Sequence, residues 1–200
     1  MVQHLKLTYF DIKGRAELSR MLFHYGDVAF VDERLSPADF GAMKPSLPNG
    51  QVPVLEIDGF VYAHSMAIAL YAAKMAGLYP SDPVKALKSD MLSYTIAELD
   101  AECTDFLFFT PDESEKTKKM NVYIEKSVPK TLAVLEKLVE GKFLLGDSIS
   151  FADVQTFDYV ENCIKSIFPS FEVTGFPKLV ALIKNVASDP KVAAYLAKSK

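Results

Sequence analysis

Tyr9, Arg15 and Ser65 combine reactive side chains with positions at which an expected strand gives way to a helix or a helix begins. A phenol donates a hydrogen bond, a guanidinium carries positive charge, and the first turn of a helix has unpaired N–H groups. Together these groups favour the binding of an anion. Taken singly, each has an ordinary explanation as a strand aromatic, a solvated residue at a helix start and a plain N-cap.

The stretch "LPNGQVPVLEIDG", residues 47–59, combines a strand-like run and an Asp-Gly turn with a proline near the head of the strand. Proline removes a backbone donor, so Pro53 either starts the strand or lies on an edge of the sheet. The alternative is that the Val52–Pro53 bond is cis and turns the Val52 backbone outward to pair with an extended, peptide-like ligand. The stretch by itself favours the first explanation.

The composition excludes several classes of function. The 200 residues are half hydrophobic and a quarter charged, as expected of a globular protein that buries a sizeable core. A net charge of −4 without a long basic run argues against nucleic acid as a partner. No run approaches the ~20 apolar residues of a membrane span, and the N-terminus does not resemble a secretory signal. The cysteines and histidines are scattered without metal-ligand or CxxC spacing, which predicts no metal site and a reducing, cytoplasmic setting: Cys103, Cys163, His4, His24 and His64.

The first eighty residues alternate between strand and helix patterns in the order βαβαββα, which predicts a small α/β domain with a mixed sheet. Ser36, Pro37 and Asp39 form a helix-start signature. The proline-containing segment 80–83 is an expected linker between domains 1–79 and 84–200. The expected strands are 5–10, 28–35, 51–57 and 60–63, and the expected helices are 14–26, 36–44 and 65–77.

Beyond the linker the sequence shows helical periods only, so the second domain is expected to be all-α. Pro129 lies inside one of these helices and should kink or split it. Ser150 and Asp153 form a further N-terminal capping signature. The expected helices are 84–109, 112–139, 151–168, 177–187 and 190–198.

An ordered set of motifs resembles the sigma class of cytosolic glutathione transferases, which includes prostaglandin D synthases, invertebrate detoxification enzymes and lens S-crystallins. The resemblance covers essentially the whole chain and implies a thioredoxin-like N-terminal domain followed by an all-helical domain. It also favours the cis form of Val52–Pro53. The motifs are "LTYFDIKGRAELSR" at 7–20, "LPNGQVPVLEIDG" at 47–59, "HSMAIALYAA" at 64–73 and "GDSISFADV" at 146–154.

The resemblance implies that the enzyme adds the thiolate of glutathione to hydrophobic electrophiles. A free thiol titrates near ~8.5, so the protein must stabilise the anion. Tyr9 is the implied donor to the sulfur, and Arg15 is the implied support. The Val52 backbone before Pro53 would pair with the cysteinyl part of glutathione, and Ser65 would bind the γ-glutamyl carboxylate.

Other implied contacts depart from the family pattern. His64 replaces the usual glutamine or glutamate, and Phe40 replaces a tryptophan whose indole would donate to the glycine carboxylate of glutathione. Lys44 and Gln51 occupy family positions near the same carboxylate. Glu98 aligns with an acidic residue that meets the γ-glutamyl amine bound to the partner subunit of a homodimer, and Asp100 is a nearby competitor.

The implied electrophile pocket lies beside Phe10 and Arg15, with Phe106 as a candidate wall. Phe106 and Phe109 are each wall or core, and the core is the favoured reading for both. Glutathione would be a co-substrate, without a separate cofactor. Three functions fit: a broad transferase, a dedicated isomerase such as a prostaglandin D synthase, or a non-catalytic crystallin or carrier. Retention of Tyr9, Arg15 and Ser65 favours catalysis. A thioredoxin-type oxidoreductase is disfavoured, because no cysteine lies near the first helix.

Overall fold

A computed structural model describes residues 4–198, so the extreme ends of both predicted domains, 1–3 and 199–200, lie outside the described residues. The first region has the predicted βαβαββα order, with a short 3₁₀ turn before the first helix. Its elements are β1 (Leu5–Phe10), the 3₁₀ turn Gly14–Ala16, α1 (Glu17–Tyr25), β2 (Val31–Leu35), α2 (Pro37–Met43), β3 (Val54–Ile57), β4 (Phe60–Ala63) and α3 (Ser65–Met75).

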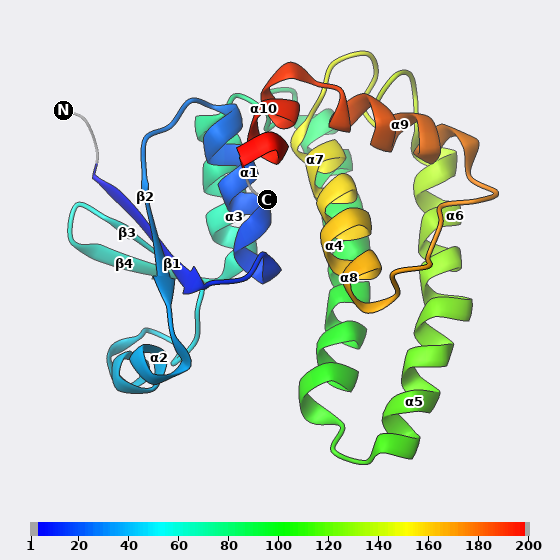
Figure 1. Cartoon of the computed structure of the whole chain (residues 1–200). Helices are drawn as coiled ribbons and strands as arrows, with labels where there is room; N and C mark the ends of the chain where they lie inside the picture. The colour runs from blue at the N-terminus through cyan, green and yellow to red at the C-terminus, as the bar shows by residue number, and fades with distance from the viewer. Residues whose placement is uncertain (1–3, 199–200) are drawn as a thin grey trace.

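The strands form one mixed sheet, as the sequence predicted, and their order is β2-β1-β3-β4. β1 runs parallel to β2 and antiparallel to β3, and β4 pairs antiparallel with β3. The helices α1 and α3 lie on the side of the sheet that faces the rest of the molecule, and α2 lies beyond one end of the sheet (Figure 1). The sheet is therefore covered on one side by helices that connect it to the second region.

Two strands begin later than the sequence pattern predicted. The Val28 N–H bonds back to the Phe23 carbonyl at 2.9 Å, so the residues after α1 first form a turn and β2 begins only at Val31. Pro53 has no N–H to give to the sheet, and β3 begins at Val54. Both differences arise from backbone hydrogen bonds that a hydrophobicity pattern does not register.

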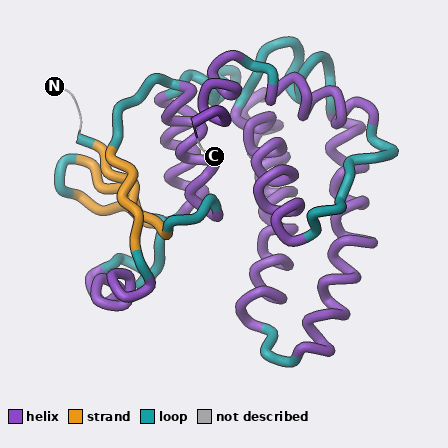
Figure 2. Tube along the Cα trace, viewed as in Figure 1, coloured by secondary structure: helices purple, strands orange, loops and turns teal. Residues whose placement is uncertain are grey.

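The described residues that follow are mainly helical (Figure 2). Pro129 lies in the first turn of α6 and splits the long helical period, as predicted, after a π-helical turn. The helices are α4 (Pro83–Thr104), α5 (Glu113–Val122), α6 (Val128–Leu138), α7 (Phe151–Asp158), α8 (Lys165–Ile167), α9 (Pro177–Ala187) and α10 (Pro190–Lys198), and the π-helical turns are Asp105–Phe109, Tyr123–Ser127 and Tyr159–Ile164.

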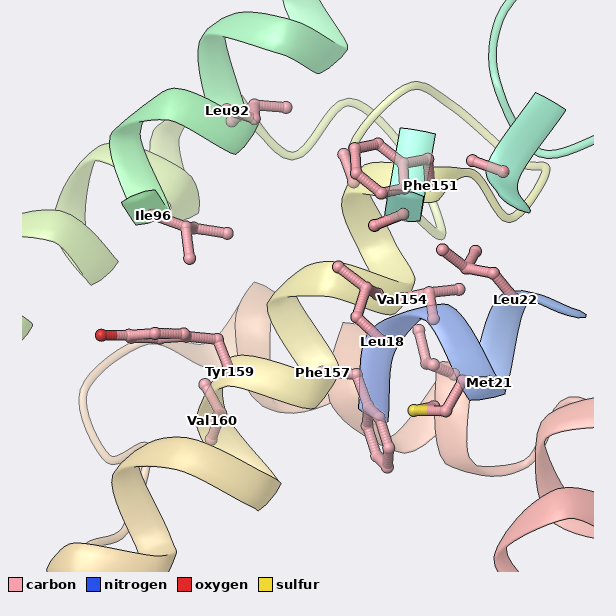
Figure 3. Packing of buried hydrophobic residues seen from close by; sticks show 14 of the residues in the cluster. Leu18, Met21, Leu22, Leu92, Ile96, Phe151, Val154, Phe157, Tyr159 and Val160 are labelled. Atoms are coloured by element: carbon pink, nitrogen blue, oxygen red, sulfur yellow. The ribbon is translucent and has the colours of Figure 1, made fainter. Parts of the chain in front are cut away.

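One continuous apolar core joins the sheet region to the helical region. Leu18 and Leu22 of α1 face Val154 of α7 (Figure 3). Leu92 and Ile96 of α4 belong to the same core. The C-terminal helix α10 returns to α1, where the Tyr195 hydroxyl donates to the buried Glu17 carboxylate at 2.8 Å. These contacts fix the helical region against the end of β1, where the candidate site lies.

Candidate active site

Tyr9 and Arg15 meet at the turn between β1 and α1. Tyr9 is 7% exposed, and its hydroxyl oxygen accepts a hydrogen bond from the Arg15 backbone N–H at 3.3 Å. Gly14 has φ +45°, and a Cβ built there would lie 2.8 Å from the Tyr9 hydroxyl oxygen. Only glycine fits so close to the ring. The phenol is thus fixed at the start of the helix while its own hydrogen can still be donated.

The buried Arg20 holds the turn that precedes Arg15. Its side chain is 1% exposed, and Nη1 donates to the carbonyls of Ile12 at 3.0 Å and Lys13 at 3.1 Å. The same atom lies 3.2 Å from the Glu17 carboxylate, which compensates the buried charge. Arg20 was not predicted as a functional residue, although it is a charged residue just before the apolar run Met21–Phe23 of α1. By holding the carbonyls of Ile12 and Lys13, Arg20 fixes the backbone turn that positions Arg15.

A pocket next to this turn brings together many of the predicted glutathione-binding residues. The bond between Val52 and Pro53 is cis, as the resemblance implied. Asn49 was not predicted, although it is a polar residue in the turn just before Gln51 and shares this pocket. The lining residues are Arg15, Asn49, Gln51, Val52, Pro53, Ala63, His64 and Ser65.

Helix α3 starts at Ser65, as predicted, but Ser65 is not its N-cap. Ser65 is the first residue of the helix, and the N-cap position belongs to His64, whose φ is +83°. The expectation that Ser65 is the N-cap is therefore wrong, because His64 is the last residue outside the helix and Ser65 already belongs to the helix. Ser65 nevertheless lies in the first helical turn, where backbone N–H groups are unpaired and can bind an anion.

Phe40 and Lys44 lie at the far end of the site, on and just after α2, and neither lines the pocket itself. The Phe40 ring packs edge-on against Phe10 with ring centroids 5.1 Å apart, and the Lys44 ammonium lies 5.9 Å from the Phe40 ring centroid. A Cβ built on Gly50 would lie 3.7 Å from the Lys44 stem. Lys44 therefore borders the turn that leads to Gln51.

Arg15 also reaches across to the helical region. Its Nη2 donates to Asp100 Oδ2 at 2.8 Å and to Thr104 Oγ1 at 2.6 Å, both on α4. Asp100 thus faces its own chain, whereas Glu98 is exposed to solvent. No sequence pattern predicts this contact, because Asp100 lies 85 positions after Arg15 in the chain.

The aromatic residues expected around an electrophile divide between surface and core. Phe10 is partly buried between Tyr9, at a centroid distance of 5.4 Å, and Phe40. Phe106 is 1% exposed and packs edge-on against Tyr123 at 5.2 Å, which confirms the favoured core position and not the alternative of a pocket wall. Phe109 is 71% exposed, so the expectation of a core position for it is wrong. The π-helical turn at the end of α4 rotates the two rings apart.

Within residues 4–198, no three His, Cys, Asp or Glu side chains are grouped so that they could hold a metal ion. Over the same residues, no helix is both long enough and apolar enough to span a bilayer.

Both regions of the chain match domains of a known protein family. Residues 5–74 match the model of the glutathione S-transferase N-terminal domain, and residues 97–199 match that of the C-terminal domain. The hematopoietic prostaglandin D synthase of Gallus gallus is 33% identical, covering 96% of this chain and 95% of its own. The chain belongs to the glutathione S-transferase family.

Solved structures agree over nearly the full length. Prostaglandin synthase D of Nilaparvata lugens superposes with a TM-score of 0.89 at 29% identity, covering 98% of each chain. A monomeric glutathione S-transferase from the hookworm Necator americanus superposes with a TM-score of 0.86 at 29% identity, covering 98% of this chain and 97% of its own. The first region is thus the thioredoxin-like N-terminal domain of the family, and the second is its helical C-terminal domain. Members use glutathione as co-substrate and need no separate cofactor.

Proposed function

We propose that this glutathione transferase is of the sigma class, that Tyr9 is its catalytic residue and that detoxification of hydrophobic electrophiles in the cytoplasm is its role. The observation that carries the assignment of Tyr9 is that this buried residue accepts, at its hydroxyl oxygen, a 3.3 Å hydrogen bond from the backbone nitrogen of Arg15, which lines the pocket. A phenol hydrogen bond and the positive potential of a helix start both stabilise a thiolate. Arg15 assists through its charge.

Glutathione fits this arrangement as an extended peptide. The Val52 backbone before Pro53 pairs with the cysteinyl part, because its N–H and C=O are at the head of a strand. Ser65 and His64, in the first turn of α3, bind the γ-glutamyl carboxylate. Gln51 and Lys44 bind the glycine carboxylate at the other end.

The proposed electrophile pocket borders the sulfur end, with Phe10 as its apolar wall and Arg15 as its charged edge. Phe40 packs on Phe10 and so joins this wall to the glycine end of the ligand. Small hydrophobic electrophiles suit a pocket that mixes aromatic rings with one cation.

Replacement of Tyr9 tests the catalytic assignment. We expect Tyr9→Phe to lower turnover of an aryl halide by about 100-fold, because one preorganised donor to an anion is lost. Glutathione affinity should change little, and the thiolate absorbance of bound glutathione should move to higher pH. Tyr25→Phe, at the opposite end of α1, is the matched control and should behave as wild type. An unchanged thiol pKa in Tyr9→Phe would refute the assignment.

A homodimer is supported by the surface of α4. Val84, Leu87, Met91 and Tyr94 are 73%, 70%, 46% and 64% exposed, and their spacing places them on one helical face. Glu98 continues the same face one turn further. An apolar stripe of this kind marks an interaction site, and we assign it to a second copy of the chain.

In this dimer Glu98 reaches the γ-glutamyl amine bound to the partner subunit. Glu98→Ala should therefore weaken glutathione binding several-fold while light scattering still reports a dimer; the size follows from the loss of one exposed, charge-assisted contact. Glu125→Ala, an exposed acid at the other end of the helical domain, is the control. A fully active monomer, as the Necator relative would suggest, would exclude a shared site.

A second candidate function is a dedicated glutathione-dependent isomerase, which the names of the Gallus and Nilaparvata relatives favour. An assay of prostaglandin D formation, run beside aryl-halide conjugation, distinguishes the two. A carrier or structural protein would bind glutathione without turnover in either assay.

A further inference from the structure

The Arg15 guanidinium is held by the helical domain, and we infer that Asp100 determines substrate specificity: it neutralises Arg15 and selects against anionic electrophiles. This inference rests on the proposed function, in which Arg15 borders both the glutathione sulfur and the electrophile. It adds the charge class of the substrate, which the proposed function leaves open.

Two acceptors on one face of α4, Asp100 and Thr104, bind the Arg15 guanidinium. Arg15 Nη2 lies 2.8 Å from Asp100 Oδ2 and 2.6 Å from Thr104 Oγ1. The Thr104 hydroxyl donates its own hydrogen to the Asp100 carbonyl at 2.7 Å, so its lone pairs face Arg15. Because residues four apart lie on the same face of a helix, α4 itself holds the two acceptors side by side without a ligand.

Arg15 is also fixed from the opposite direction. Its backbone N–H is bonded to the Tyr9 hydroxyl, and the residue lines the pocket together with Val52 and Ser65. The cation therefore lies between the sulfur site and α4, where an electrophile must enter. A carboxylate or sulfonate on that electrophile would be attracted to Arg15, but it would be repelled by the Asp100 carboxylate that already binds the same guanidinium nitrogen. Like charges brought together in this way disfavour binding, which is how many sites reject wrong ligands.

A purely structural role for the pair would have small effects. The Arg15 and Asp100 side chains are 44% and 39% exposed, and ion pairs of such exposure contribute little to stability. The apolar core between α1, α4 and α7 already joins the two domains. Asp100→Asn should therefore fold normally, with an unchanged midpoint of urea unfolding.

A matched pair of aryl chlorides tests the inference: 4-chloro-3,5-dinitrobenzamide, which is neutral, and 4-chloro-3,5-dinitrobenzoate, which is anionic. Wild type should prefer the amide. Asp100→Asn should raise the benzoate-to-benzamide ratio of kcat/KM by about fivefold, mainly through a lower KM for the benzoate, as the exchange of one exposed charge pair allows. The intrinsic reactivities of the two substrates cancel when variants are compared.

Asp105→Asn is the control, because it removes the same charge from the end of the same helix. The Asp105 carboxylate lies 2.7 Å from Lys119 and not at Arg15, so the ratio should stay at the wild-type value. Equal shifts in both variants, or no shift in either, would overturn the inference while amide conjugation by wild type upheld the proposed function. Failure of wild type to conjugate the amide or to bind glutathione would refute the proposed function and the inference with it.

Discussion

The chain contains two copies of the same short pattern, Ser-x-x-Asp at a helix start, in opposite environments. At α2, Ser36 and Asp39 form a capping box in which both residues are exposed. At α7, Ser150 and Asp153 form the same box with exposures of 6% and 0%. The local geometry is nearly identical, because each serine hydroxyl donates to its aspartate at 2.6 Å.

The difference lies in what else each aspartate contacts. The second oxygen of Asp153 accepts from the Leu144 N–H at 2.8 Å and so ties a preceding loop to the core helix. Asp39 bonds only within its own box among the described contacts, and no residue of α2 is buried. The buried box therefore supports the fold of the helical domain, whereas the exposed box supports a helix that carries or adjoins proposed ligand-binding residues.

The largest expected effect is loss of stability at the buried box. Asp153→Ala leaves the N–H groups of Ser150 and Leu144 without their acceptor, and buried unpaired donors cost about 1–3 kcal/mol each. We expect urea unfolding to report a loss of about 2–5 kcal/mol. Asp39→Ala is the matched control and should shift the midpoint far less. Similar losses at the two boxes would show that burial does not separate them.

The pH dependence of stability should have opposite signs at the two boxes. Hydrogen bonds from Ser36 lower the pKa of Asp39, so its contribution is present above the unfolded pKa and disappears as the pH falls. Burial raises the pKa of Asp153 despite its hydrogen bonds, so its contribution is greatest in acid and declines as the pH rises through the folded pKa.

Urea titrations between pH 3 and 7 check this contrast when each variant is subtracted from wild type. The stability advantage of wild type over Asp39→Asn should grow with rising pH, and its advantage over Asp153→Asn should shrink. Slopes of the same sign would contradict the assignment of burial as the dominant cause at Asp153.

The smallest expected effect is on glutathione affinity, through the proposed contacts of Phe40 and Lys44. Phe40 cannot donate a hydrogen bond, so Lys44 is the main proposed partner of the glycine carboxylate. A hydrogen bond to a charged group is worth about 1.5–3 kcal/mol, and at this exposed site we expect the low end. Phe40→Trp should tighten glutathione binding several-fold, and Lys44→Ala should weaken binding more in wild type than in Phe40→Trp.

Calorimetric titration of wild type, the two single variants and the double variant measures the coupling between positions 40 and 44. If Phe40→Trp leaves the affinity unchanged and the two changes are additive, then position 40 does not contact the ligand and α2 does not serve the site as proposed.

Local sequence patterns predicted much of the fold. Alternation gave β1 at its observed bounds, and the helical periods gave α9 and α10 at theirs. Pro129 marked the division before α6, and the two Ser-x-x-Asp patterns marked the starts of α2 and α7. These features depend on residues within a few positions of one another, so the sequence alone carries them.

Two local details were not predicted correctly. The π-helical turn that buries Phe106 and exposes Phe109 follows a period that a regular helix does not have. Helix α3 starts at Ser65 as expected, but its N-cap is His64, with φ +83°, and not the serine.

The sequence by itself determined the order of the elements, the helix starts and the motifs of the glutathione site, because each rests on backbone preferences and hydrogen bonds between near neighbours. Tertiary structure alone decided which capping box is buried, and it alone brought Asp100 to Arg15 across 85 positions of the chain. The physical reason is that burial and charge pairing depend on how the two domains pack, and identical local patterns do not encode the surroundings they will meet.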